Sequence, residues 1–174
     1  LYTLIGILAA RGEVKRSRSW YTFKLRASRK ALDLACDALK KLGVKSQVKV
    51  IAQSKRGILA YWRSKKLGEL IEEKVPELLD SREKIPPSIL SASRGEIAAF
   101  LRGFLSCYEN GKAIRIRLQS RRDVDRLRLL LLKVGVVAKE HSDHSITLTR
   151  PQVDHITQGH AMVDGSSKIP CVSQ

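Results

Sequence analysis

Two segments of the chain, residues 21–26 and 114–119, alternate apolar side chains with polar ones. A period of two predicts β-strands with one buried face and one exposed face. The exposed positions suited to nucleic acid are Lys24, Arg26, Arg115, Arg117 and Gln119. Arginine and lysine bind phosphates, and arginine and glutamine also hydrogen-bond to guanine and adenine edges. The two predicted strands therefore favour contact with nucleic acid.

The whole chain carries a large excess of positive charge. Its 174 residues include 33 Lys and Arg against 17 Asp and Glu, which gives a net charge of +16. Such an excess produces a positive field that extends beyond contact distance and attracts a polyanion. Further basic residues near the predicted strands are Lys15, Arg16, Arg18 and Lys49. With 43% hydrophobic residues, the chain is expected to fold alone.

Several other classes of protein do not fit the sequence. No apolar run approaches the roughly 20 residues that cross a bilayer, and residues 1–14 are too short for a secretory signal. Three cysteines without paired spacing predict neither a disulfide framework nor a zinc ribbon. The four histidines, His141, His144, His155 and His160, lack a second compact ligand pair, so no metal site is predicted. A cytoplasmic protein fits, with a nucleoid-associated or organellar location as alternatives.

One structural unit occurs twice in the chain. Residues 28–44 and 120–136 superpose without a gap, and both have helical apolar spacing. Each begins with a serine suited to an N-cap and has a glycine, Gly43 or Gly135, where the helix should stop. In each copy a strand precedes this helix, and two further strands and another helix follow it. The later elements are expected near 46–52, 57–63 and 64–75 in the first copy, and near 136–141, 145–149 and 151 in the second.

The repeat divides the chain into a first unit at 1–79 and a second unit at 93–158. Between them, residues 80–92 hold the Pro86-Pro87 pair, which cannot continue a helix and predicts a linker. Ser93 and Glu96 form a predicted capping box that opens the second unit. Residues 159–174 are predicted to be a C-terminal tail.

Each unit contains a helix rich in small and apolar residues. Residues 4–12, LIGILAARG, resemble the nine-residue signature of the LAGLIDADG homing endonucleases through Leu4, Gly6, Ala10 and Gly12. Residues 101–111 match it through Leu101, Gly103, Phe104 and Leu105. The resemblance implies an α+β fold of two pseudo-symmetric αββαββα halves, whose curved antiparallel sheets form a saddle over DNA. Gly6 and Gly103 would let the two signature helices approach closely.

The resemblance fails at the positions that matter most for cleavage. Active members of the family carry an acidic residue before the last glycine of each motif, and these carboxylates hold a divalent metal. Arg11 occupies the first position; the second is Tyr108 when counted from Gly103, or Asn110 when counted back from Gly111. Glu13 and Glu109 lie nearby and are the fallback metal ligands.

The second copy is also shorter than the first. From Gly6 to Ser28 is 22 residues, whereas from Gly103 to Ser120 is 17 residues. The second groove-reading hairpin is therefore predicted to be shorter, and the nucleic-acid footprint to be asymmetric.

These patterns predict a nucleic-acid-binding protein that favours double-stranded DNA over RNA, has lost the family's cleavage activity and uses no cofactor. One alternative is an active endonuclease that uses Mg²⁺ with Glu13 or Glu109. Another is an RNA-binding splicing factor similar to maturases, and a third is a basic partner in a ribonucleoprotein. Because both copies lie in one chain, a monomer with internal pseudo-twofold symmetry is expected.

Overall fold

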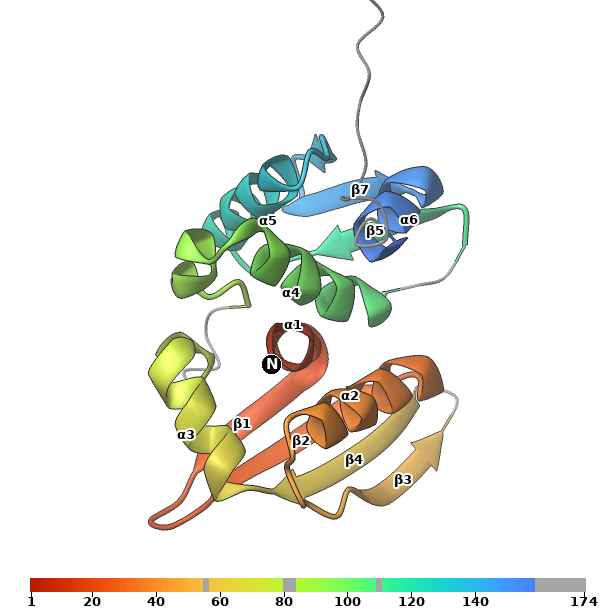
Figure 1. The fold of residues 1–174 in the computed structure, drawn as a ribbon. Coiled ribbons are helices and arrows are strands. Elements are labelled where there is room, and N and C mark those ends of the chain that lie inside the picture. Colours follow the sequence, from red (N-terminus) through yellow and green to blue (C-terminus); the bar gives the residue numbers. More distant parts are fainter. Residues whose placement is uncertain (55–56, 80–83, 109–110, 159–174) are drawn as a thin grey trace, which may run out of the picture.

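The computed structural model describes residues 1–54, 57–79, 84–108 and 111–158, which form two α+β halves (Figure 1). The first half consists of α1 (Tyr2–Arg11), β1 (Gly12–Arg16), β2 (Tyr21–Ala27), α2 (Arg29–Lys41), β3 (Lys49–Ser54), β4 (Gly57–Arg63) and α3 (Lys65–Lys74). Two 3₁₀ helices, η1 (Pro76–Leu79) and η2 (Pro87–Ser91), follow. The second half consists of α4 (Arg94–Ser106), β5 (Ala113–Arg117), α5 (Arg121–Lys133), β6 (Lys139–His141), β7 (Ser145–Thr149) and α6 (Arg150–Gln158). Within these residues, no helix is long and apolar enough to cross a membrane.

Each half contains one antiparallel sheet. The first has strand order β1-β2-β4-β3, and the second has the order β5-β7-β6. Alternate residues of β2 and β5 are buried, which confirms the predicted strands at 21–26 and 114–119. Helices α2 and α3 cross one face of the first sheet (Figure 1), so the basic side chains lie on its other face. We call the uncovered face of each sheet its open face.

The helix boundaries follow local signals in the sequence. The side chains of Ser28 and Ser120 accept hydrogen bonds from backbone N–H groups in the first turns of α2 and α5, as predicted. Gly43 and Gly135 follow the ends of these helices with φ of 64° and 84°, a backbone conformation that favours glycine. Ser93 and Glu96 form the predicted capping box at the start of α4. Each cap satisfies backbone groups that a helix end leaves unpaired.

The second half departs from the predicted αββαββα order. Between α4 and α5, its described residues contain one strand, β5, whereas the first half has β1 and β2 between α1 and α2. The chain from Gly103 to Ser120 is too short for a second strand of the same length and the turn that would join it. The described part of the second half therefore has the order αβαββα, and the protein is asymmetric about its pseudo-twofold axis.

The segment between the halves is packed into the core. Ile85 and Ile89, within the predicted linker, are fully buried. The backbone N–H of Ile85 donates to Oδ1 of Asp123 at 3.0 Å, and the Ile85 carbonyl accepts from Arg126 at 3.1 Å. These contacts attach the connection to α5, so residues 84–92 help to fix the second half.

Candidate nucleic-acid interface

The crossing of α1 and α4 defines the pseudo-twofold axis. A Cβ atom placed on Gly6 would lie 2.0 Å from the carbonyl oxygen of Phe100, and one on Gly103 would lie 1.9 Å from that of Thr3. Each contacted carbonyl belongs to the residue three positions before the other glycine. The contacts are therefore reciprocal, and Gly6 is equivalent to Gly103. Figure 1 shows α1 end-on, between the first sheet and α4.

This equivalence identifies which residues face each other at the helix ends. Five positions after the glycines lie Arg11, at the end of α1, and Tyr108, in the turn after α4. Asn110, the other candidate for the second position, and Glu109 lie outside the described residues. The guanidinium carbon of Arg11 is 4.8 Å from the centre of the Tyr108 ring, a cation–π contact. By this equivalence, Arg11 and Tyr108 stand at the two positions where the family resemblance implies acids.

Burial governs the chemistry of Tyr108. Its ring packs against Phe104, with ring centres 5.3 Å apart. Burial raises the pKa of the Tyr108 hydroxyl, and the nearby Arg11 charge opposes that shift. The hydroxyl therefore remains protonated at neutral pH and can donate a hydrogen bond.

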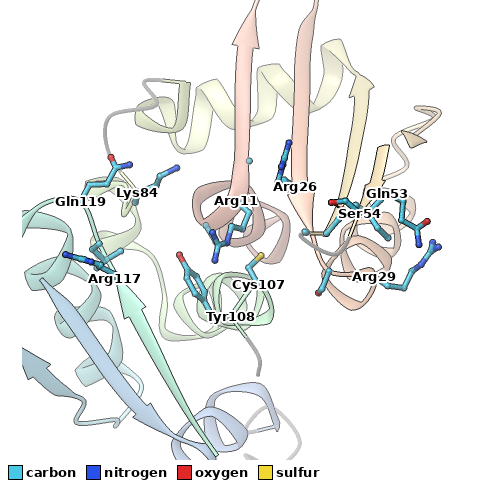
Figure 2. A pocket seen from close by; sticks show the side chains of 17 residues that line it. Arg11, Arg26, Arg29, Gln53, Ser54, Lys84, Cys107, Tyr108, Arg117 and Gln119 are labelled. Atoms are coloured by element: carbon cyan, nitrogen blue, oxygen red, sulfur yellow. Dashed lines mark hydrogen bonds between the residues drawn. The ribbon is translucent and has the colours of Figure 1, made fainter. Parts of the chain in front are cut away.

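An open cleft of about 820 Å³ surrounds this pair and separates the open faces of the two sheets (Figure 2). Arg26 of β2 borders the cleft from the first half, and Arg117 of β5 borders it from the second. The basic residues that line it are Arg11, Arg26, Arg29, Lys84 and Arg117. Among the described lining residues there is no aspartate or glutamate. The cleft therefore suits an anion.

The five cleft cations form no ion pair among the described residues, whereas three other cations of the predicted interface do. Outside the cleft, Lys15 pairs with Glu13 at 2.9 Å. Arg16 points toward α3 and pairs with Glu72, which also accepts a hydrogen bond from Tyr21. Since an existing partner must be displaced before a cation can bind another anion, the unpaired cleft cations are the better phosphate ligands.

The remaining predicted contact residues divide between the two open faces and the loops. Lys24 lies on the open face of β2, and Lys49 of β3 lies opposite Tyr61 on the same face. Arg18 is exposed in the loop between β1 and β2. Gln119 lines the cleft just after β5 (Figure 2).

Arg115 is a special case among the predicted contacts. It lies on the open face of β5, but its side chain donates to Ser145 at 2.9 Å and to Asp143 at 3.0 Å. The hydrogen bond from Ser145, and then the hydrogen bond and the charge of Arg115, lower the pKa of the Asp143 carboxyl, so the pair stays charged at neutral pH. The positive charge of Arg115 is therefore partly neutralised by Asp143 before any nucleic acid binds.

Sequence reasoning missed three basic residues of this surface. Arg29 begins α2 at the edge of the cleft. The repeat pairs it with Arg121, but that identity does not indicate where the side chain lies. Arg63 lies opposite Thr22 on the open face, and the alternation of residues 57–63 was the available signal. Lys84 reaches the cleft from the connection between the halves, where no sequence pattern marks it.

The residues present do not fit the divalent metal that the family resemblance implies. Within the described chain, no three His, Cys, Asp or Glu residues are grouped so that they could hold a metal ion. Glu13, one fallback ligand, is absent from the cleft lining and bonds to Lys15, an interaction that lowers the pKa of its carboxyl. His141 hydrogen-bonds to Thr147 at 3.0 Å. Arg11 places a positive charge where the metal would be held, which opposes cation binding.

Comparison with known proteins identifies the fold. No protein-family model and no curated protein sequence matches the chain. Variants of the homing endonuclease I-DmoI align with a TM-score of 0.61 and 16% identity over 91% of this chain and 94% of theirs. A structure of I-DmoI in complex with DNA and Ca aligns with a TM-score of 0.60 and 16% identity, over 94% of this chain and 88% of that one. The N-terminal LAGLIDADG domain of DUF199/WhiA aligns with a TM-score of 0.56 and 14% identity over 94% and 82% of the two chains. The chain therefore has the LAGLIDADG fold that its two signature helices implied.

Proposed function

We propose that this protein binds double-stranded DNA across the open faces of its two sheets and does not cleave it. The observation that carries the proposal is the cleft between the sheets. Five cations line it that form no ion pair among the described residues, and no described carboxylate borders it. Duplex DNA presents closely spaced phosphates on both strands, so a continuous basic surface of this kind can neutralise several at once. A structure of I-DmoI, which shares the fold, in complex with DNA supports DNA as the ligand.

The shape of the first half favours DNA over RNA. Its β1–β2 hairpin forms one side of the four-stranded sheet, with Lys15 and Lys24 on the open face. The major groove of B-form DNA admits a two-stranded ribbon, whereas the major groove of A-form RNA is too narrow for side chains to read. The described residues of the second half contain one strand in this place, so the footprint is asymmetric, with most base contacts from the first half.

Loss of cleavage follows from the helix ends. Hydrolysis of a phosphodiester by this family needs carboxylates that hold a metal against the scissile phosphate. Arg11 and Tyr108 supply none, and Glu13 is ion-paired on β1. We therefore infer that the protein binds DNA without cutting it. It does so as a monomer whose two halves supply the interface.

The proposal is tested by binding to a labelled duplex of about 40 base pairs at several salt concentrations, with and without Mg²⁺. If each of the five cleft cations contacts one phosphate, log K against log salt has a slope of about −4.5 or steeper. Products are run on a denaturing gel. Uncut strands with steep salt dependence support the proposal, and discrete fragments that require Mg²⁺ contradict it. Stronger competition by structured RNA than by unlabelled duplex would favour the RNA-binding alternative.

A matched pair of double variants separates the cleft from net charge alone. Arg26→Ala with Arg117→Ala removes two cleft cations, and Lys41→Ala with Arg94→Ala removes two exposed cations elsewhere. Lys41 ends α2 and Arg94 begins α4, and each lies about 18–20 Å along its helix from the end that borders the cleft. The cleft variant should lose at least about 10-fold in affinity and the control less than about 3-fold. Equal losses would mean that the cleft has no special role.

A further inference from the structure

The point at which the helix ends meet the cleft carries a fixed cation. Arg11 is the last residue of α1, where the unpaired carbonyl groups create a partial negative charge. A helix C-terminus stabilises a positive group, and here the chain supplies that group itself. A divalent ion at the same place would meet both this charge and the other cleft cations.

The Arg11 side chain is in contact with an aromatic ring. Its guanidinium lies over the Tyr108 ring, and no carboxylate of the described residues forms an ion pair with it. A guanidinium is planar and carries its N–H groups in that plane, where two of them can bond to two oxygens of one phosphate. Lysine has no such planar fork, so the geometry is specific to arginine.

Tyr108 offers a second donor at the same place. Burial raises the pKa of its hydroxyl, which lines the cleft together with Arg11. A neutral hydroxyl can donate a hydrogen bond to a phosphate oxygen, whereas a phenolate would repel it. Figure 2 shows both side chains in the middle of the cleft, with Arg26 and Arg117 on its two sides.

We propose that Arg11 and Tyr108 form a clamp for one backbone phosphate of the bound DNA, and that the guanidinium replaces the divalent metal at this position. This inference rests on the proposed function and assigns the central contact within it. The flanking cations hold neighbouring phosphates, while the clamp holds one phosphodiester at the pseudo-twofold axis. The clamp makes binding independent of Mg²⁺.

The decisive variants keep the charge or the packing and remove only the clamp geometry. Arg11→Lys retains the positive charge but loses the planar fork, and Tyr108→Phe retains the ring but loses the hydroxyl. Arg11→Ala removes both charge and fork, and Arg94→Ala is the matched control at the far end of α4. Circular dichroism and thermal melting establish that each variant is folded before affinity for the duplex is measured.

The clamp predicts a particular order of affinities. Arg11→Ala should weaken duplex binding by about 10- to 100-fold and make the salt slope shallower by about 1. Arg11→Lys should lose most of that affinity while it keeps the slope, and Tyr108→Phe should lose about 3- to 10-fold. Arg94→Ala should change affinity by less than about 2-fold.

Two results would overturn the clamp while the proposed function stands. One is wild-type affinity in Arg11→Lys, which would make Arg11 an ordinary cation. The other is tighter wild-type binding when Mg²⁺ is added at constant ionic strength, which would mean that the site holds a metal. Failure of the wild-type protein to bind any duplex would instead overturn the proposed function, and the clamp with it.

Discussion

Replacement of Gly103 by alanine tests the crossing on which the whole arrangement depends. The new Cβ atom would lie 1.9 Å from the carbonyl oxygen of Thr3, and real Cβ atoms stay at least 3.0 Å from such atoms. Because the obstacle is backbone, α1 and α4 would have to separate by about 1 Å through a tightly packed core. Overpacking of this kind costs about 3 kcal/mol, against which alanine recovers about 1 kcal/mol of helix propensity. A net loss of about 2 kcal/mol should lower the melting temperature by about 4–8 °C in a domain of this size.

The same helix provides the control. A Cβ atom on Gly95 meets nothing within 4 Å, so Gly95→Ala should gain up to about 1 kcal/mol from helix propensity alone. Both variants are compared by thermal melting and by urea unfolding. Gly6→Ala should resemble Gly103→Ala, and the double variant should lose less than the sum, since one separation makes room for both methyl groups. Equal or higher stability of Gly103→Ala relative to Gly95→Ala would refute the close crossing.

Three further outcomes are expected. Arg115→Ala should weaken duplex binding less than Arg117→Ala, because Arg115 is already paired within the protein; the reverse order in a binding titration would contradict this. Ser93→Ala should cost about 1 kcal/mol of unfolding free energy at neutral pH. The Ser93 backbone N–H, and then the Ser93 hydroxyl, donate hydrogen bonds that lower the pKa of the Glu96 carboxyl. The stabilisation from these bonds is present above the pKa that Glu96 has in the unfolded state, and it is lost as the pH falls through the pKa of the folded state. Alanine keeps the backbone bond to Glu96, so only the part of the deficit that comes from the hydroxyl–carboxylate bond should shrink below about pH 4 in denaturant titrations. A constant deficit would argue against that bond. Trp20, 52% exposed in the β1–β2 loop, should become less accessible to acrylamide when duplex binds; unchanged fluorescence quenching would place this hairpin outside the interface.

Most elements of the fold were predictable because their causes are local. Alternation in 21–26 and 114–119 marks β2 and β5, and serine caps with following glycines bound α2 and α5. Each of these signals depends on residues close together in the sequence, so it can be recognised without the tertiary structure. The repeat then gave the architecture, since two equivalent units must bury equivalent faces.

Features that depend on contacts between distant segments were predicted incompletely. The length difference after Gly103 predicted a shorter hairpin, but the reduction to one strand within the described residues appeared only in the structure. The proline pair predicted a linker, whereas Ile85 and Ile89 are core residues bonded to or packed near α5. Burial of a short connection depends on which distant segments pack against it, and a local sequence pattern does not indicate those segments.

The sequence by itself determined the repeat, the strand and helix periods, the excess of positive charge and the absence of an acid at residue 11. Only the tertiary structure decided that Tyr108 faces Arg11, because that pairing depends on the reciprocal backbone contacts of Gly6 and Gly103. It also decided which of the described cations form ion pairs, since a pair such as that between Arg16 and Glu72 joins residues 56 positions apart. Charge is a property of composition, but the availability of a charge to a ligand depends on the three-dimensional positions of its neighbours.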